Sequence, residues 1–170
     1  MTRYRPPAPK KSAYITPDGY AKLQAEQQAL WQRRAEVTVA LSEAAAEGDR
    51  SENAEYIYRK KELREIDRRI HYLQHRLPDL TVVSAQATDL TRIYFGAWVR
   101  VADEADKEMT YRIVGPDEFD PALGWISMDS PMARAMMKKT VDDEIQVETP
   151  SGVMVYYVLE VHYEPPVICV

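Results

Sequence analysis

Residues 48–53 read Gly48-Asp49-Arg50-Ser51-Glu52-Asn53, and they separate two long helical patterns. Gly48 ends the first pattern, as glycine commonly does after a helix. Ser51 can cap the second, with acidic residues in its first turn. A connection this short places the two helices antiparallel. The sequence therefore predicts a helical hairpin with residues 48–53 at its tip, where Asp49 and Glu52 share an exposed turn.

Both helices show an apolar seam with alternating spacings of three and four residues, which is typical of a coiled coil. The first helix is expected to begin at Thr16-Pro17-Asp18, with Thr16 as its N-cap and Pro17 at its first position. Pro78 is expected to close the second helix. The first seam comprises Tyr20, Leu23, Gln27, Leu30, Arg34, Val37, Leu41 and Ala44. The second comprises Leu63, Ile66, Ile70, Leu73 and Leu77.

After Pro78 the apolar period changes to two, which indicates strands. A short helix is expected over residues 131–139, with Ser130 as its cap and Pro131 at its first position. The predicted fold is α+β: residues 16–79 form an antiparallel coiled-coil hairpin, and residues 80–170 form a small, mostly antiparallel sheet domain. Residues 1–15 are expected to be a flexible basic arm. The predicted strands are residues 81–83, 94–101, 109–114, 145–148 and 153–161.

The composition is that of a globular protein, with 45% hydrophobic and 29% charged residues among 170. Cys169 is the single cysteine, so no internal disulfide is possible, and a reducing, cytoplasmic location is expected. No apolar run is long enough for a membrane span, and no membrane partner is expected. The net charge of −5 hides an asymmetry: residues 81–170 carry 15 acids against 7 bases, whereas the second helix is mildly basic. Two domains with different partners are consistent with this asymmetry.

The tip carboxylates of Asp49 and Glu52 can share a hard divalent cation such as Mg²⁺, but two ligands make an incomplete site. A partner would have to complete it, and the metal could then assist attack on a phosphodiester. General acid–base catalysis is less favoured, because an exposed tip offers no burial that would raise the pKa of a carboxyl. Helix capping alone is the alternative interpretation of these two acids.

The residues around the tip resemble the signature of the bacterial Gre transcript-cleavage factors. The similarity lies in residues 48–56 and 60–69, and it continues in residues 94–99 and 127–135. It extends over nearly the whole chain, from about residue 16 to residue 163. Arg50, with the Lys60-Lys61 and Arg68-Arg69 pairs, is more similar to the GreB branch than to the GreA branch. The arm of residues 1–15 is longer than that branch suggests and has no assigned role.

The resemblance implies a stimulator of transcript cleavage and not an enzyme in its own right. Such factors bind bacterial RNA polymerase and insert the hairpin through its secondary channel. Asp49 and Glu52 would then help to hold Mg²⁺ jointly with the polymerase, which cleaves the backtracked 3′ segment of the nascent RNA. Arg50, Ser51 and Asn53 would support the tip. The protein is expected to act as a monomer without a cofactor of its own.

The same resemblance assigns roles to the second helix and to the sheet domain. Lys60, Arg64 and Arg68 recur every four residues, with Lys61 and Arg69 beside them, and this basic face would contact RNA phosphates or polymerase. A solvated helix face is the alternative. The second domain is expected to be FKBP-like and to dock at the rim of the channel. Its docking residues would be Asp129, Ser130 and Pro131, of which the last two also suit a helix start.

Two other functions stay open on the sequence. One is a regulator that binds the channel without promoting cleavage, although the intact acids of the tip argue against it. The other is a free-standing prolyl isomerase or chaperone, since fold alone does not determine function. A free-standing nuclease is disfavoured because two carboxylates do not complete a metal site.

Overall fold

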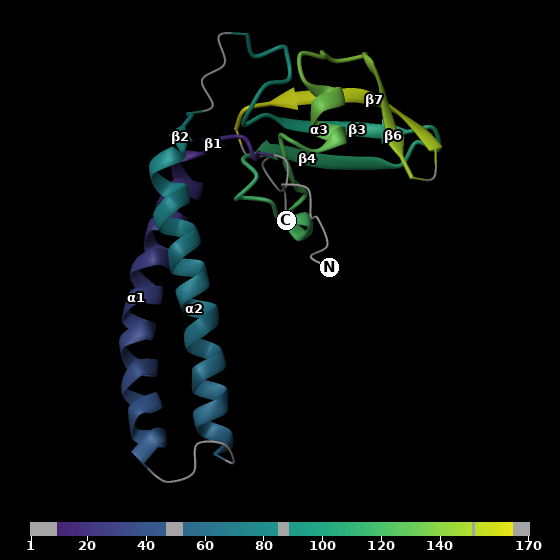
Figure 1. Cartoon of the computed structure of the whole chain (residues 1–170). Coiled ribbons are helices and arrows are strands. Elements are labelled where there is room, and N and C mark those ends of the chain that lie inside the picture. Colours follow the sequence, from purple (N-terminus) through teal and green to yellow (C-terminus); the bar gives the residue numbers. More distant parts are fainter. Residues whose placement is uncertain (1–9, 47–52, 85–88, 151, 165–170) are drawn as a thin grey trace, which may run out of the picture. The chain divides into compact units, whose positions relative to one another are not determined.

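The computed structural model describes residues 10–46, 53–84, 89–150 and 152–164 (Figure 1). The chain divides into two compact units. One is the helical hairpin, Asp18–Leu80, and the other joins the residues up to Pro17 with those from Thr81 onward. The elements are β1 (Tyr14–Ile15), α1 (Pro17–Ala46), α2 (Ala54–Asp79), β2 (Thr81–Val82), β3 (Trp98–Asp103), β4 (Glu108–Val114), the 3₁₀ helix η1 (Pro121–Leu123), β5 (Trp125–Ser127), α3 (Pro131–Met136), β6 (Glu144–Thr149) and β7 (Gly152–His162).

The hairpin consists of α1 and α2 lying side by side along most of their lengths (Figure 1). Its central core is Val37 from α1 packed with Ile66 and Ile70 from α2, and Leu30 and Leu63 lie against this cluster. All of these residues belong to the two predicted seams, so the seams are confirmed. A single narrow stripe on each helix suffices because each helix needs only one partner. Charged and polar residues dominate the remaining faces, although Trp31, Val39, Ile57 and Tyr58 are exposed there.

The ends of α2 differ from the prediction. The helix begins at Ala54, and Asn53 is its N-cap, whereas the sequence placed the cap at Ser51. Ser51 lies outside the described residues. Pro78 does not stop the helix, which continues to Asp79. Proline is tolerated there because it gives up one backbone donor only a residue before the helix ends.

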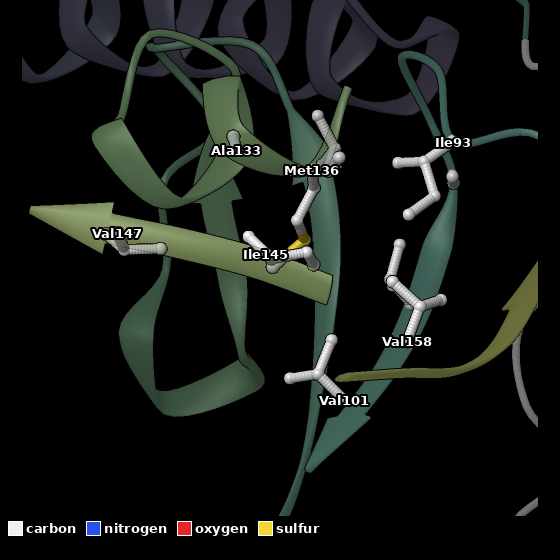
Figure 2. Packing of buried hydrophobic residues seen from close by; sticks show 10 residues of the cluster. Ile93, Val101, Ala133, Met136, Ile145, Val147 and Val158 are labelled. Atoms are coloured by element: carbon white, nitrogen blue, oxygen red, sulfur yellow. The ribbon is translucent and has the colours of Figure 1, made fainter. Parts of the chain in front are cut away.

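The second unit contains a five-stranded sheet with the order β5-β4-β3-β7-β6. The four longer strands pair antiparallel, as expected, and the three-residue β5 adds in parallel to β4. Figure 2 shows side chains of this core, among them Met136 of α3 beside Ile145 of β6. The α3 helix therefore covers one face of the sheet. The buried core comprises Ile93, Ala97, Val99, Val101, Ile113, Ala133, Met136, Ile145, Val147 and Val158.

Two of these elements are shorter than predicted. The strand expected from residue 94 begins at Trp98, because residues 94–97 form a turn in which Gly96 has a φ of 87°. The helix expected to reach residue 139 ends at Met136, and Lys138 has a φ of 69°, which is incompatible with a continuing helix.

The last residues of the basic arm are packed, unlike the flexible arm expected there. Tyr14 and Ile15 form β1, which pairs in parallel with β2. The pairing continues on both sides, since the Thr81 N–H donates to the Ala13 carbonyl and the Val83 N–H donates to the Ile15 carbonyl. Gly115 lies so close that a Cβ atom there would be 2.2 Å from the Tyr14 carbonyl oxygen. Only glycine fits this approach.

Candidate functional site

The structure describes the two flanks of the hairpin tip. Four of the predicted tip residues, Asp49, Arg50, Ser51 and Glu52, lie outside the described residues. The flanks are the C-terminal end of α1 at Ala46 and the N-terminal end of α2 at Ala54. The part played by the tip acids therefore stays a prediction from the sequence, and the structure adds how the chain around them is held.

Asn53 holds the two flanks together. Its side-chain oxygen accepts a hydrogen bond from the Tyr56 N–H at 3.1 Å, which caps α2. Its side-chain nitrogen donates to the Ala44 carbonyl at 2.9 Å, which satisfies one of the orphan carbonyls in the last turn of α1. One amide thus bonds to both helices and ties the last turn of α1 to the first turn of α2.

Within the described residues no group of three or more His, Cys, Asp and Glu side chains is placed to hold a metal ion. The predicted donors at the tip are the carboxylates of Asp49 and Glu52, which lie outside the described residues. Carboxylate oxygens are the ligands that Mg²⁺ prefers, so the chemistry of this pair fits that ion. The number of ligands does not complete its shell, which leaves positions for water and for a partner.

Ion pairs between arginines and carboxylates connect α1 to α2 along the hairpin. Arg69 binds Glu26 through two hydrogen bonds of 2.7 and 2.8 Å, the bidentate geometry that gives guanidinium–carboxylate pairs their strength. Arg34 donates to Asp67 at 2.6 Å, which explains how an arginine is accommodated at a seam position. A further pair joins Arg33 to Glu62 at 2.6 Å.

Glu62 forms ion pairs with two arginines, Arg33 and Arg59, and its side chain is only 19% exposed. The hydrogen bonds from Arg33 are the main cause that lowers the pKa of Glu62 from its ordinary value, and burial opposes them. The same contacts raise the pKa of Arg33. The carboxylate is therefore held in its charged form at the contact between the helices.

The predicted basic face is divided by these contacts. Arg69 bonds to Glu26 and so faces the neighbouring helix. Lys60, Lys61, Arg64 and Arg68 are exposed. Four positively charged side chains therefore remain on the solvent side of α2, where they can meet phosphates by charge without reading sequence.

The exposed bases belong to a longer row that the sequence reasoning missed. Lys61, Arg64, Arg68, His71 and His75 follow one another at spacings of three and four, and all five are exposed. We call this row the solvent stripe. The His71 and His75 Nε2 atoms lie 3.2 Å apart, so one ring donates a hydrogen bond to the other. Helical spacing alone would have found the two histidines.

Aromatic side chains lie beside the bases nearest the tip. The Lys60 ammonium is 5.5 Å from the centre of the Tyr56 ring, and the Arg59 guanidinium is 5.6 Å from that of Tyr58. Tyr58 is 62% exposed. An exposed ring beside cations is the combination on which single-stranded nucleic acids stack without sequence preference.

The predicted docking residues lie at the start of α3, within the sheet domain. Ser130 is the N-cap of α3, since its hydroxyl accepts from the Ala133 N–H at 3.1 Å, and Pro131 is the first residue of the helix. Asp129 accepts two hydrogen bonds from Ser12, one from its N–H at 2.9 Å and one from its hydroxyl. Ser130 and Pro131 thus have a structural role, and Asp129 is engaged within the chain.

Comparison with known proteins gives consistent matches over most of the chain. Residues 13–82 match the family described as "Transcription elongation factor, N-terminal", and residues 87–163 match "Transcription elongation factor, GreA/GreB, C-term". The chain is 56% identical to transcription elongation factor GreB of Xanthomonas axonopodis pv. citri (strain 306), over 96% of this chain and 98% of that protein. It is 54% identical to GreB of Pseudomonas aeruginosa, over 97% and 99%.

Among solved structures, the crystal structure of GreA factor homolog 1 (Gfh1) from Thermus thermophilus matches with a TM-score of 0.42 and 23% identity, over 89% of this chain and 99% of that one. In the residues that the structure describes, no helix has the length and hydropathy to cross a bilayer.

Proposed function

Because the chain belongs to the GreA/GreB family of transcription elongation factors, we propose that it binds bacterial RNA polymerase and stimulates cleavage of backtracked nascent RNA. In this proposal the hairpin enters the polymerase through the secondary channel and brings the tip acids to its active site. The polymerase cuts the RNA, and this chain is a stimulator. The released 3′ fragment leaves a new 3′ end from which synthesis resumes.

The observation that carries the proposal is the pairing of an acidic tip with a two-helix support. Asp49 and Glu52 lie in a connection of six residues whose ends are tied together by Asn53. A helix of 30 residues is about 45 Å long, which lets a narrow hairpin carry its tip far from its base. Two carboxylates on such a support suit a metal site that a partner completes.

Mg²⁺, when bound, supplies Lewis-acid stabilisation of the phosphodiester that is cut. Asp49 and Glu52 would hold it jointly with groups of the polymerase, through carboxylate oxygens. Arg50 and Ser51 would support the two acids, and Asn53 bonds to both of the helices that flank them.

The solvent stripe supports the RNA part of the proposal. Lys61, Arg64 and Arg68 offer charge to phosphates, and Tyr58 offers a ring on which a base can stack. Phosphate contacts and base stacking do not depend on the RNA sequence. This suits a factor that meets whatever RNA has been extruded by backtracking.

The test is RNA release from a stalled, backtracked polymerase complex in Mg²⁺, with wild type compared with Asp49→Ala/Glu52→Ala. We expect the double variant to bind the polymerase normally and to lower the cleavage rate about 10–100-fold, the usual cost of losing groups that position a metal. The matched control is Glu65→Ala/Asp79→Ala, which removes two exposed carboxylates from the same hairpin away from the tip. This control should cleave like wild type.

Other outcomes separate the alternatives. Cleavage that is unchanged in the tip variant would contradict the role of Asp49 and Glu52. Binding of wild type without cleavage would favour a regulator that occupies the channel. Prolyl isomerase turnover in the absence of polymerase, insensitive to the tip variant, would favour the free-standing isomerase.

A further inference from the structure

Residues 10–16, which we call the N-terminal segment, are attached to the sheet domain by three acidic side chains. Asp129 accepts the two hydrogen bonds from Ser12, and Asp117 lies 3.8 Å from the Lys11 ammonium. Glu118 accepts from the Thr16 N–H at 3.0 Å and from the Thr16 hydroxyl. The C-terminal end of the basic arm, which had no assigned role, is therefore bonded to this domain.

The N-terminal segment forms one side of a hollow on the domain. The cavity has a volume of about 530 Å³, and we call it the docking groove. Lys10 and Lys11 contribute from the segment, and Arg134 contributes from α3. Pro116 and Phe119 supply apolar surface, with Phe119 57% exposed. The remaining lining residues are Ser127, Asp129 and Ser130.

The charge of this groove contrasts with that of the domain around it. Residues 81–170 carry a net charge of −8, yet three cationic side chains line the groove and two of them come from the N-terminal segment. Lys10 and Arg134 have no ion-pair partner among the residues that the structure describes. Asp129, the acid of the groove, is already engaged by Ser12. An occupant that presents carboxylates beside an apolar side chain therefore fits best.

We propose that the N-terminal segment completes the surface on which the sheet domain docks to the polymerase. In this inference Lys10 meets a carboxylate on a polymerase segment whose apolar side chain lies against Phe119. Ser12 is a positioning residue: it fixes Asp129 and the segment to each other, so that the groove is already formed before binding. The inference rests on the proposed function, because the partner is the polymerase.

The experiment titrates full-length protein into stalled, backtracked polymerase complexes. The half-saturating concentration and the maximal cleavage rate are measured separately, at two salt concentrations. Lys10→Glu reverses a charge in the groove, and Lys10→Arg keeps it. Lys107→Glu is the matched control, since Lys107 is an exposed lysine of the same domain outside the groove lining.

We expect Lys10→Glu to raise the half-saturating concentration about 5–10-fold, as charge reversal at an interface does, with less effect at high salt. The maximal rate should not change, because the tip is intact. Lys10→Arg and Lys107→Glu should behave like wild type. Ser12→Ala should raise the half-saturating concentration about 3–10-fold through the lost hydrogen bond to a charged group, and Ser12→Thr should restore it.

Two results would overturn the inference while the proposed function stands. One is a half-saturating concentration of Lys10→Glu equal to that of Lys107→Glu. The other is tighter binding by Ser12→Ala, which would show that the segment competes with the polymerase for Asp129. If wild type fails to bind polymerase at all, the proposed function fails and the inference fails with it.

Discussion

At the scale of single residues, Asn53 shows how one side chain can hold both sides of a tight connection. It caps α2 through its oxygen and bonds to the α1 carbonyl of Ala44 through its nitrogen. These two roles need an acceptor and a donor on one short side chain. Asparagine provides both, whereas aspartate provides only acceptors.

This difference allows the two roles to be separated by mutation. Asn53→Asp keeps a good N-cap but removes the donor to Ala44, so we expect little change in the stability of α2 and a several-fold lower rate of transcript cleavage. Asn53→Ala removes both, and it should lower the free energy of unfolding by about 1 kcal/mol in addition. Urea unfolding and the cleavage assay measure the two effects. Full cleavage activity of Asn53→Asp would contradict the positioning role of the bond to Ala44.

At the scale of the elements, the hairpin is joined by a short apolar core and by ion pairs on its flanks. Val37, Ile66 and Ile70 supply the buried contacts, and Glu62 lies between Arg33 and Arg59. The apolar part does not respond to pH. The contribution of Glu62 does, because its pKa is lower in the folded state than in the unfolded chain.

The direction of this pH dependence follows from the lowered pKa. The stabilisation from Glu62 is complete above the pKa of an unfolded glutamate, about 4.3, and it is lost as the pH falls through the lower folded value. We expect Glu62→Gln to lower the melting temperature at pH 7 by about 1–3 °C, and we expect this difference from wild type to shrink as the pH falls below about 4. Thermal unfolding between pH 3 and 7 measures it. Glu65→Gln, an exposed acid on the same helix, is the control, and an equal effect there would contradict the prediction.

The elements also show what the sequence could predict. The two seams, the short connection and the Ser130-Pro131 helix start are local patterns, and they gave the hairpin and α3. The strands β1 and β5 have two and three residues, which is too few for a period to be seen. The N-cap of α2 is Asn53 and not the predicted Ser51. The bond from Asn53 to Ala44 involves the neighbouring helix, so a local pattern does not reveal it. Arg69 is not part of the exposed basic face, because it bonds to Glu26, which lies 43 positions away in the sequence.

At the scale of the whole molecule, the chain before the hairpin is tied to the sheet domain by Glu118. This acid is 9% exposed and accepts hydrogen bonds from the Gly115 N–H and from the N–H and hydroxyl of Thr16. Nothing in the local sequence marks the pairing of Glu118 with Thr16, because the two residues lie 102 positions apart. The attachment of the N-terminal segment could therefore be seen only in three dimensions.

The loss of this acid should have a large effect. We expect Glu118→Ala to lower the free energy of unfolding by about 2–3 kcal/mol, since a buried charged acceptor and its donors lose their bonds. Hydrogen exchange at the Thr16 and Gly115 amides should become faster by a larger factor than in the rest of the sheet. Glu148→Ala, an exposed acid on β6, serves as the control. Equal exchange rates in the two variants would contradict the role of Glu118.

The parallel pair β1–β2 has a consequence for the order in which the protein is made. Tyr14 and Ile15 leave the ribosome early, but their partners Thr81 and Val82 follow only after the whole hairpin has been synthesised. Asp117, Glu118 and Asp129, which hold the same segment, emerge later still. Tyr14 and Ile15 are thus fixed only after the residues of the hairpin have been made, and the hairpin can form on the nascent chain before them.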